Sequence, residues 1–480
     1  MGEIITFYAY KGGTGRTMAL ANTAILLARQ AKGRVLMIDW DLEAPGLEAY
    51  FKSSMADWEK QKGIFDFVAK AEKTLKKMPY GEEDKELLDA YFEEIEKLTL
   101  PVNISGEKSN LYLVRAGLSN DTYSDRINKF SWSRFYKKIP DFFPLFAKFL
   151  SKRFDYVLID SRTGHTDIGG ICTMSMPDKL VLVFTPNEQS LEGVLKLAMN
   201  AADYRMKFGD LRPLSIYPLP TRVDFNGVTL DKRLYWQEQY RIRWEKMTRK
   251  IYALPSTTNL TEYFDKVYVR HDSNYAFGEE LAVLSENEGI ESLSQDYRRF
   301  VTYLSYDEIW KDEPFADLTS PYQVFFLFAE ADRSMTKDLF LHIEPLAARQ
   351  KVITLGESAN NFLSVEALDD GFRRKIGSGG VDFLVIFLSQ ALLDQRQEWI
   401  HEFREFLDHS NSFGKYRIVP ILIDEIKDNL DFLSGIPITP TPKKPVKEWI
   451  DPDEAWLKVA SDFRQRLINY HEKIKSASYA

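Results

Sequence analysis

A glycine-rich loop near the N terminus, KGGTGRT from Lys11 to Thr17, constrains the fold more than any other segment. The apolar residues 4–10 before it predict a buried β-strand, and the apolar spacing of residues 17–33 after it predicts a helix. Glycines let successive backbone N–H groups point at one anion, and a helix N-terminus adds partial positive charge. The loop therefore predicts a phosphate-binding site. Its candidate residues are Lys11, Gly12, Gly13, Thr14, Gly15, Arg16 and Thr17.

Two later apolar runs, RVLMIDW and YVLIDS, carry carboxylates at their ends. The first run contains Asp39 and is followed by Asp41, and the second contains Asp160. Thr17 occupies the position where such a loop places a hydroxyl ligand for Mg²⁺. The loop together with these strand ends predicts that the chain binds a nucleotide.

Short apolar runs alternate with helical patterns along most of the chain. Continuous β-branched or aromatic runs suit strands that are buried on both faces of a parallel sheet, so an α/β fold with a doubly wound, mostly parallel sheet is expected. A second α/β series follows an acidic stretch that contains two prolines. The predicted organisation is a nucleotide-binding domain at 1–310 with helical insertions at about 52–110 and 225–310, a linker at 311–321, and a second domain at 322–480.

Composition narrows the possible functions of this 480-residue chain. A net charge of −8 provides no general basic field for nucleic acid, although a local basic patch stays open. Cys172 is the one cysteine in the sequence, which excludes a disulfide framework and a cysteine-based zinc site. The N terminus has no signal-peptide pattern and the longest apolar run is too short for a membrane span, so a cytoplasmic location is expected.

The stretch at 231–254 is long, basic and aromatic. An amphipathic helix whose aromatic residues pack on the domain is the favoured interpretation. A nucleic-acid-binding face is the alternative, and the glutamates of the segment weaken it.

The loop and the strand ends together resemble the deviant Walker A family of P-loop ATPases, which includes MinD and ParA. Lys11, Gly12, Gly13, Gly15 and Thr17 match the family pattern, and the segment DWDLEAPG places the chain near an arginine-variant branch. The resemblance covers about residues 1–225 and implies ATP as ligand and a homodimer across two nucleotides. It further implies that Lys11 reaches the partner's phosphates, that Asp160 holds Mg²⁺ through water with Asp39 next to the metal, and that Asp41 orients the attacking water.

Arg16 departs from this pattern, because the family has a lysine at its position. Arginine is planar, bulkier and bidentate, so it keeps the charge but changes the geometry. Three outcomes are open: slower hydrolysis, phosphate contact by Lys11 alone, or binding without hydrolysis. Slow hydrolysis, with the nucleotide acting as a dimerisation switch, is favoured.

The base-binding residues are less visible in the sequence. Arg222 and Asp224 follow the run LSIYPLP, at the place where the family contacts the base, and a surface ion pair is the alternative. ATP is favoured over GTP by the resemblance alone, and the sequence has no N-K-x-D motif.

The C-terminal part, from about 320 to 472, resembles a TIR domain, a flavodoxin-like α/β fold. The runs YQVFFLFAEAD and VDFLVIFLSQ resemble its strands, and Ser389 and Trp399 resemble its polar and aromatic landmarks. Catalytic TIR domains cleave NAD with a glutamate, which the family spacing would place at Phe403. Glu402, and then Glu398, are therefore the candidates, and a TIR-like domain that only assembles with other proteins is the alternative.

Two functions follow from these resemblances. The first is a nucleotide-switched signalling protein of the kind found in antiphage defence, in which ATP-driven dimerisation controls a TIR-like domain that cleaves NAD or recruits partner proteins. The second is a ParA-like or MinD-like positioning or scaffold ATPase with a non-catalytic interaction domain. A metabolic ATPase with an iron–sulfur cluster is disfavoured because one cysteine per chain is too few.

Overall fold

The computed structural model divides the chain into two compact units, Met1–Met247 with Asn259–Ile309, and Thr248–Thr258 with Trp310–Ala480. Most of the linker expected at 311–321 lies outside the described residues. The structure describes residues 2–56, 58–75, 82–104, 107–118, 121–163, 170–208, 214–225, 230–252, 259–276, 278–286, 292–306, 318, 320–348, 352–354, 362–367, 380–409, 417–441, 443–450 and 452–478.

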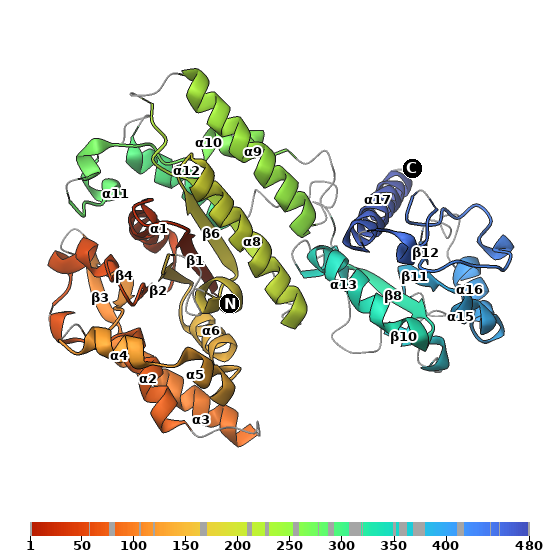
Figure 1. Cartoon of the computed structure of the whole chain (residues 1–480), viewed down its shortest axis with the longest axis horizontal. Helices are drawn as coiled ribbons and strands as arrows, with labels where there is room; N and C mark the ends of the chain where they lie inside the picture. The colour runs from red at the N-terminus through yellow and green to blue at the C-terminus, as the bar shows by residue number, and fades with distance from the viewer. Residues whose placement is uncertain are drawn as a thin grey trace. The chain divides into compact units, whose positions relative to one another are not determined.

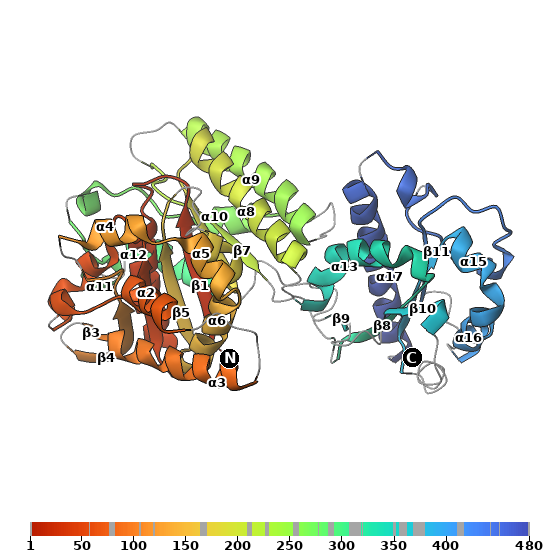
Figure 2. The ribbon, with the colours of Figure 1, turned by 60° about the horizontal axis from the view of Figure 1, so that its bottom comes forward.

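The first unit is built on a seven-stranded sheet in the order β3-β4-β2-β5-β1-β6-β7 (Figures 1 and 2). Only the β3–β4 pair is antiparallel among the described strands. The five runs predicted as strands in this half are confirmed, because each forms a strand of this sheet. The strands are β1 Glu3–Ala9, β2 Val35–Trp40, β3 Leu100–Ile104, β4 Glu107–Val114, β5 Tyr156–Ser161, β6 Lys179–Phe184 and β7 Ser215–Pro220.

Strands β3 and β4 correct the expectation that the segment at 52–110 contains only helices. β3 lies at the edge of the sheet and alternates buried and exposed positions, unlike the fully buried β2 and β6. A five-residue edge strand with polar positions carries a weak apolar signal, which is why the sequence pattern did not reveal it.

Helices cover both faces of the sheet in the first unit. α1 and α12 pack on one face, where Phe7 of β1 meets Phe300 of α12 edge to face at 6.4 Å. The helices are α1 Arg16–Gln30, α2 Ile64–Thr74, α3 Glu82–Phe92, α4 Tyr123–Lys129, α5 Trp132–Lys138, α6 Phe142–Arg153, α8 Glu188–Phe208, α9 Leu230–Tyr252, α10 Thr261–Lys266, α11 Ala282–Ser285 and α12 Leu293–Tyr306. Shorter turns are η1 Leu47–Ser54, η2 Trp58–Lys60, η3 Glu93–Leu98, η4 Ile171–Ser175 and η5 Ser273–Ala276.

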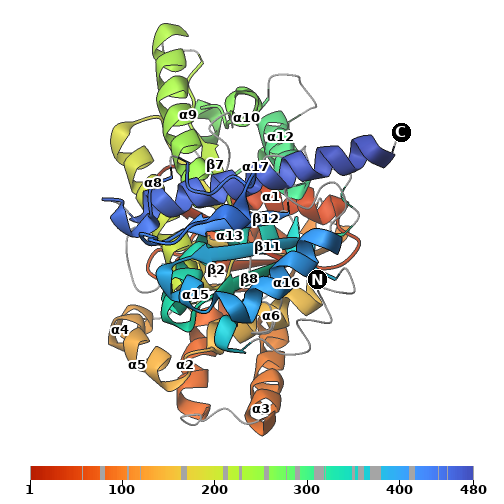
Figure 3. The same cartoon turned by 90° about the vertical axis from the view of Figure 1, so that its right-hand side faces the viewer.

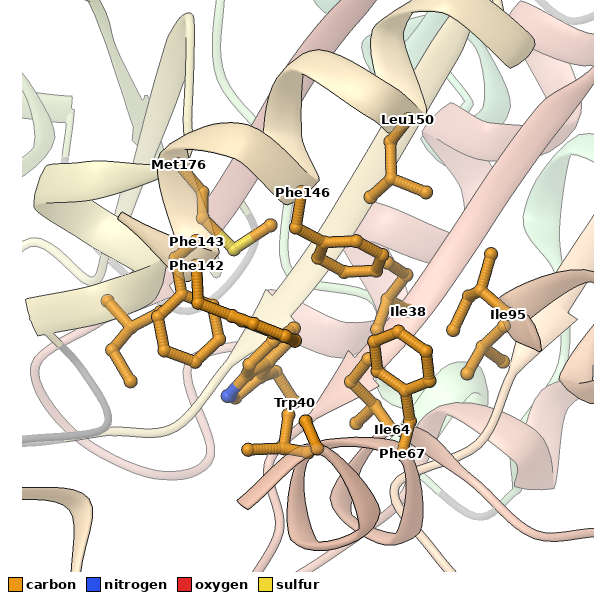
Figure 4. Packing of buried hydrophobic residues seen from close by; sticks show 14 of the residues in the cluster. Ile38, Trp40, Ile64, Phe67, Ile95, Phe142, Phe143, Phe146, Leu150 and Met176 are labelled. Atoms are coloured by element: carbon orange, nitrogen blue, oxygen red, sulfur yellow. The ribbon is translucent and has the colours of Figure 1, made fainter. Parts of the chain in front are cut away.

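An aromatic cluster fills the other face, between the sheet and α2 and α6 (Figure 4). Trp40 of β2 meets Phe143 of α6 edge to face at 5.9 Å, and Phe67 of α2 packs on Phe146 at 5.2 Å. Aromatic side chains of this size bury 150–250 Å² each, so the cluster holds β2, and with it the carboxylates that follow, in a rigid position.

Helix α9 is amphipathic, in line with the favoured interpretation of the segment at 231–254. Tyr240 and Trp244 are buried and both contact Phe184 of β6. Arg243 forms ion pairs with two glutamates of α8, and the two helices run side by side (Figures 1 and 2).

The second unit has a parallel sheet in the order β10-β8-β11-β12, with β9 pairing the start of β8. α13 and α17 pack on one face and α15 and α16 on the other (Figure 3). The elements are β8 Tyr322–Phe328, α13 Arg333–Ala348, β9 Ile353–Thr354, β10 Phe362–Ser364, β11 Phe383–Leu388, α15 Gln390–Asp394, α16 Arg396–His409, β12 Ile418–Leu422 and α17 Pro452–Ser478, with the short turns η8 Glu330–Asp332, η10 Val365–Ala367, η12 Asp431–Leu433 and η13 Val446–Glu448. The chain is therefore an α/β protein with two separate sheets.

Among the described residues, no helix has the length and apolar character needed to span a membrane.

Candidate nucleotide site

The loop leaves β1 and enters α1 through two glycines with left-handed backbone. Gly13 has φ 73° and Gly15 has φ 88°, and at Gly15 no side chain caps the helix. A side chain at either position would be strained, since L-residues rarely adopt these angles. The first turn of α1 contains no acidic residue, so its free N–H groups and partial positive charge stay available to an anion.

Arg16 turns inward to two carboxylates of the sheet. Its Nε donates to Oδ1 of Asp160 at 2.6 Å and its Nη2 donates to Oδ2 of Asp41 at 2.9 Å. The side chain is 7% exposed. Burial alone would lower the pKa of Arg16, but Asp160 and Asp41 outweigh it and raise the pKa above its ordinary value. The third nitrogen, Nη1, is buried and has no partner among the described residues. A guanidinium N–H in this state needs an acceptor, which a phosphate oxygen supplies.

Thr17 and Asp160 form an oxygen-rich pair beside this guanidinium. The Thr17 hydroxyl donates to Oδ2 of Asp160 at 2.8 Å. Asp160 is completely buried, and burial raises its pKa although Arg16 and Thr17 act in the opposite direction. Mg²⁺ binds oxygen ligands, usually through one or two carboxylates plus substrate phosphates. The donor set therefore fits Mg²⁺ with Thr17 and Asp160 as its protein ligands.

The carboxylate of Asp39 is bound by the loop that follows β2, and its placement next to the metal stays a prediction. The carboxylate accepts three backbone N–H groups, from Asp41, Gly46 and Leu47, each at 3.1 Å. Burial, and after it the charge of Asp160, raises the pKa of Asp39. Asp39 therefore fixes the loop after β2, and through it the position of Asp41.

The start of the loop is held by α8. Lys11 Nζ donates to Oε1 of Gln189, one turn from Gly193. The ring of Tyr10 lies on the backbone of Gly193 so closely that a Cβ there would come within 2.0 Å of Tyr10 Cγ. In this state the Lys11 ammonium is therefore paired within its own chain.

A shallow hollow lies beside the loop, on the side of Thr14 and Gly15. Its volume is about 60 Å³, well below the 300–1,000 Å³ of typical ligand pockets. Arg222 lines it and has φ 53°, an unusual backbone for a non-glycine residue and of the kind found at ligand sites. Asp224 is not among the lining residues.

Sequence reasoning missed most of the walls of this hollow. They come from the segment before α12 and from α12 itself, and these parts carry no local motif. The missed residues of these parts are Val269, Arg270, His271, Asp272, Tyr275, Leu293 and Tyr297, and Met18 and Thr221 were missed as well. Only the fold brings them to the loop, about 250 residues away in sequence.

Two of the candidate residues in the second unit, Ser389 and Trp399, make contacts that stabilise the fold. The hydroxyl of Ser389 donates to Oδ2 of Asp332 at 2.6 Å and accepts the N–H of Leu392 at 3.1 Å, which caps α15. Trp399 is buried, and its indole N–H donates to the carbonyl of Leu392. Glu398 is exposed. Glu402 lies on α16, and its side chain is outside the described part of the chain.

No protein-family model matches the chain, and no curated protein matches it. Several solved structures are similar over about two thirds of its length. The septum site-determining protein MinD complexed with Mg-ADP from Pyrococcus horikoshii OT3 is 16% identical, with a TM-score of 0.38, over 64% of this chain and 97% of that chain. An ATP complex of McdA from Cyanothece is 14% identical, with a TM-score of 0.43, over 63% of this chain and 96% of that chain. A putative plasmid partition protein from Borrelia burgdorferi B31 bound to AMPPNP is 16% identical, with a TM-score of 0.39, over 64% of this chain and all of that chain.

Proposed function

We propose that the first unit binds ATP with Mg²⁺ and hydrolyses it slowly, and that the nucleotide controls pairing of two chains. The observation that carries this proposal is the buried guanidinium of Arg16 in the glycine loop, which donates to two carboxylates and leaves its buried Nη1 without a partner among the described residues. A loop with free backbone amides and an unpaired cationic N–H is complementary to a phosphate chain.

The slow rate follows from the partners of Arg16. Phosphoryl transfer depends on positioning and charge compensation, and Mg²⁺ held at Thr17 and Asp160 would neutralise phosphate charge. Arg16 occupies Oδ1 of Asp160 and Oδ2 of Asp41, the two groups that the resemblance assigns to the metal and the attacking water. For hydrolysis, Arg16 has to release both carboxylates. Breaking two charge-assisted hydrogen bonds in a buried site adds to the barrier.

Lys11 supplies the second cation of the proposal. It is paired with Gln189 of its own chain, and a glutamine exchanges for a phosphate at lower electrostatic cost than a carboxylate would. In the proposed dimer Lys11 leaves Gln189 and reaches the partner's nucleotide.

For the second unit, a protein-interaction module without NAD chemistry is the better supported proposal. Its strand order corresponds to the first four strands of the flavodoxin-like order 2-1-3-4-5, taking β9 and β10 together as the second strand. The hydroxyl of Ser389 is already used by Asp332 and by the cap of α15. The chain as a whole is then a positioning or scaffold ATPase rather than an NAD hydrolase.

Titration calorimetry of the full chain with ATP, ADP and GTP in Mg²⁺ tests nucleotide binding, and light scattering with each nucleotide tests pairing. We expect ATP binding, dimers with ATP and monomers with ADP. Lys11→Ala should bind ATP but stay monomeric, whereas Lys148→Ala, on the exposed side of α6, should behave as the wild type. Absence of ATP binding by folded protein contradicts the proposal. Nicotinamide release from NAD with ATP present contradicts the proposed role of the second unit.

A further inference from the structure

A second hollow lies in the first unit, away from the glycine loop. It is formed by η2, α2, η3 and α4, and none of its lining residues belongs to the glycine loop or to the shallow hollow beside that loop. Its volume is about 790 Å³, within the 300–1,000 Å³ range of small-molecule sites. The hollow is therefore large enough to hold most of a nucleotide-sized ligand.

The walls of this hollow carry an excess of positive charge. Its ionisable residues are Lys60, Lys62, Lys70, Lys73, Lys97, Arg126, Asp66 and Glu94. A net charge of −8 on the whole chain makes this local excess a distinct feature rather than part of a general basic field.

Both acidic residues of the hollow are already neutralised. Asp66 pairs with Arg126 and also accepts the backbone N–H groups of Gly63 at 3.0 Å and Leu118 at 2.9 Å. Glu94 pairs with Lys70, and with Lys97 at 3.7 Å. These contacts use two acidic groups and three of the cations.

Three lysines remain, Lys60, Lys62 and Lys73, and they form no ion pair within the described part of the chain. Two acidic side chains of the neighbouring helices are engaged elsewhere. Glu72 pairs with Arg134 at 2.7 Å and Glu96 pairs with Arg34 at 2.7 Å. The unpaired positive charge of the hollow is therefore not compensated by these neighbours.

The floor of the hollow is apolar. Phe67 is buried there, with Ala69, Leu98 and Leu118 half-buried around it. An apolar floor lowers the local dielectric, which strengthens the attraction between a bound anion and the lysines at the rim. A ligand with a ring or carbon frame and several anionic groups matches both features.

We propose that this hollow binds a small molecule that carries several phosphate groups. Lysine ammonium groups act as point charges for phosphate, and three of them around a concave apolar floor suit a compact polyphosphorylated ligand better than an extended chain. A single hollow of this size favours this ligand class over a nucleic acid, which would need an extended stripe of charge along the surface. The site is independent of the proposed ATP site.

The test is titration calorimetry of the full chain with inositol hexakisphosphate as probe, with a non-hydrolysable ATP analogue at saturation so that the glycine loop is not available to the probe. We expect one site per chain, with an affinity that falls as salt rises. The triple variant Lys60→Glu/Lys62→Glu/Lys73→Glu should bind at least tenfold more weakly. The matched variant Lys148→Glu/Lys152→Glu, which changes exposed lysines of α6, should bind within twofold of the wild type.

Circular dichroism should give the same thermal midpoint for both variants, because all of these lysines are exposed. Absence of probe binding, or equal weakening in the two variants, overturns the proposal. Tighter binding of a short DNA duplex than of the probe, lost in the triple variant, also overturns it and assigns the hollow to nucleic acid. Since ATP binding is measured in separate titrations without the probe, and the triple variant changes only the hollow, a failed ATP site and a failed hollow give different results.

Discussion

Arg16 Nε and Asp160 Oδ1 lie 2.6 Å apart, so the cation of the glycine loop is bound to the carboxylate that would serve Mg²⁺. The same guanidinium reaches Asp41 at 2.9 Å. One arginine therefore links the loop to the ends of two neighbouring strands, β2 and β5. A lysine ammonium is a single point charge and lacks the planar fork that spans both carboxylates.

Replacing Arg16 by lysine should raise the rate of ATP hydrolysis. Lysine has fewer N–H donors than arginine, so the substitution should free at least one carboxylate for metal or water. We expect the rate of ATP hydrolysis to rise about tenfold, which corresponds to a barrier lower by about 1.4 kcal/mol. Phosphate release at saturating Mg²⁺ and ATP measures this. A rate equal to or below that of the wild type, with ATP binding intact, argues against the explanation. Lys148→Arg serves as the control for a change of cation on the surface.

Removing Arg16 should destabilise the protein because it leaves two buried carboxylates without their partner. Loss of one member of a buried ion pair costs about 3–5 kcal/mol, so Arg16→Ala should lower the free energy of unfolding of the first unit by about that amount. Asp160→Asn in the Arg16→Ala background should recover part of the loss. Denaturant unfolding of the two single variants and the double variant gives the coupling energy. Additive effects would show that the pair is not coupled.

Gly193→Ala should displace the start of the glycine loop, although alanine is more favourable than glycine in a helix by about 1 kcal/mol. The new Cβ would lie within 2.0 Å of Tyr10 Cγ, so Tyr10 and the adjacent Lys11 have to move. We expect a lower thermal midpoint and at least tenfold weaker ATP binding. Gly278→Ala is the matched control, because no atom lies within 4 Å of a Cβ there. If both variants bind ATP like the wild type, Tyr10 does not position the loop.

Asp332 and Asp424 in the second unit should show opposite pH dependence. Burial raises the pKa of Asp332, while the hydrogen bond from Lys447 lowers the pKa of Asp424. A raised pKa means that the folded state holds the proton more tightly than the unfolded state. Ionised Asp332 therefore destabilises the folded protein as pH rises above about 3.9, the pKa of an aspartate in the unfolded chain. A lowered pKa means that Asp424 adds stability at pH values above that same unfolded value, and loses it as pH falls.

Asp332→Asn should therefore gain thermal stability relative to the wild type as pH rises from 4 to 7, while Asp424→Asn should lose it. The second effect should be small, since Asp424 and Lys447 are both partly exposed. Thermal midpoints of the three proteins across this pH range give the two differences. Parallel pH profiles for both variants would contradict the assignment.

Much of the architecture could be predicted from the sequence. Runs such as RVLMIDW and VDFLVIFLSQ are mostly apolar, and such runs form strands where both faces of a sheet are covered. The glycines of the loop were equally informative, since Gly13 and Gly15 adopt backbone angles that other residues avoid. The edge strand β3 was missed because its alternating pattern is only five residues long.

Two other features of the structure could not be predicted from sequence patterns. The lysines of the second hollow are spread over η2, α2, η3 and the loop between η2 and α2, and each looks like an ordinary exposed residue in its own segment. The residues that line the shallow hollow beside the glycine loop, such as Tyr275 and Tyr297, belong to no motif. Both sets come together only when packing brings separate segments of the chain side by side.

The sequence by itself determined where strands and helices form and which loop can accept a phosphate, because these properties depend on neighbouring residues and on the backbone freedom of glycine. Only the tertiary structure decided what Arg16 does. Its partners lie 25 and 144 residues away, and a charged group takes the partner that the fold places within hydrogen-bonding distance in a buried, low-dielectric site.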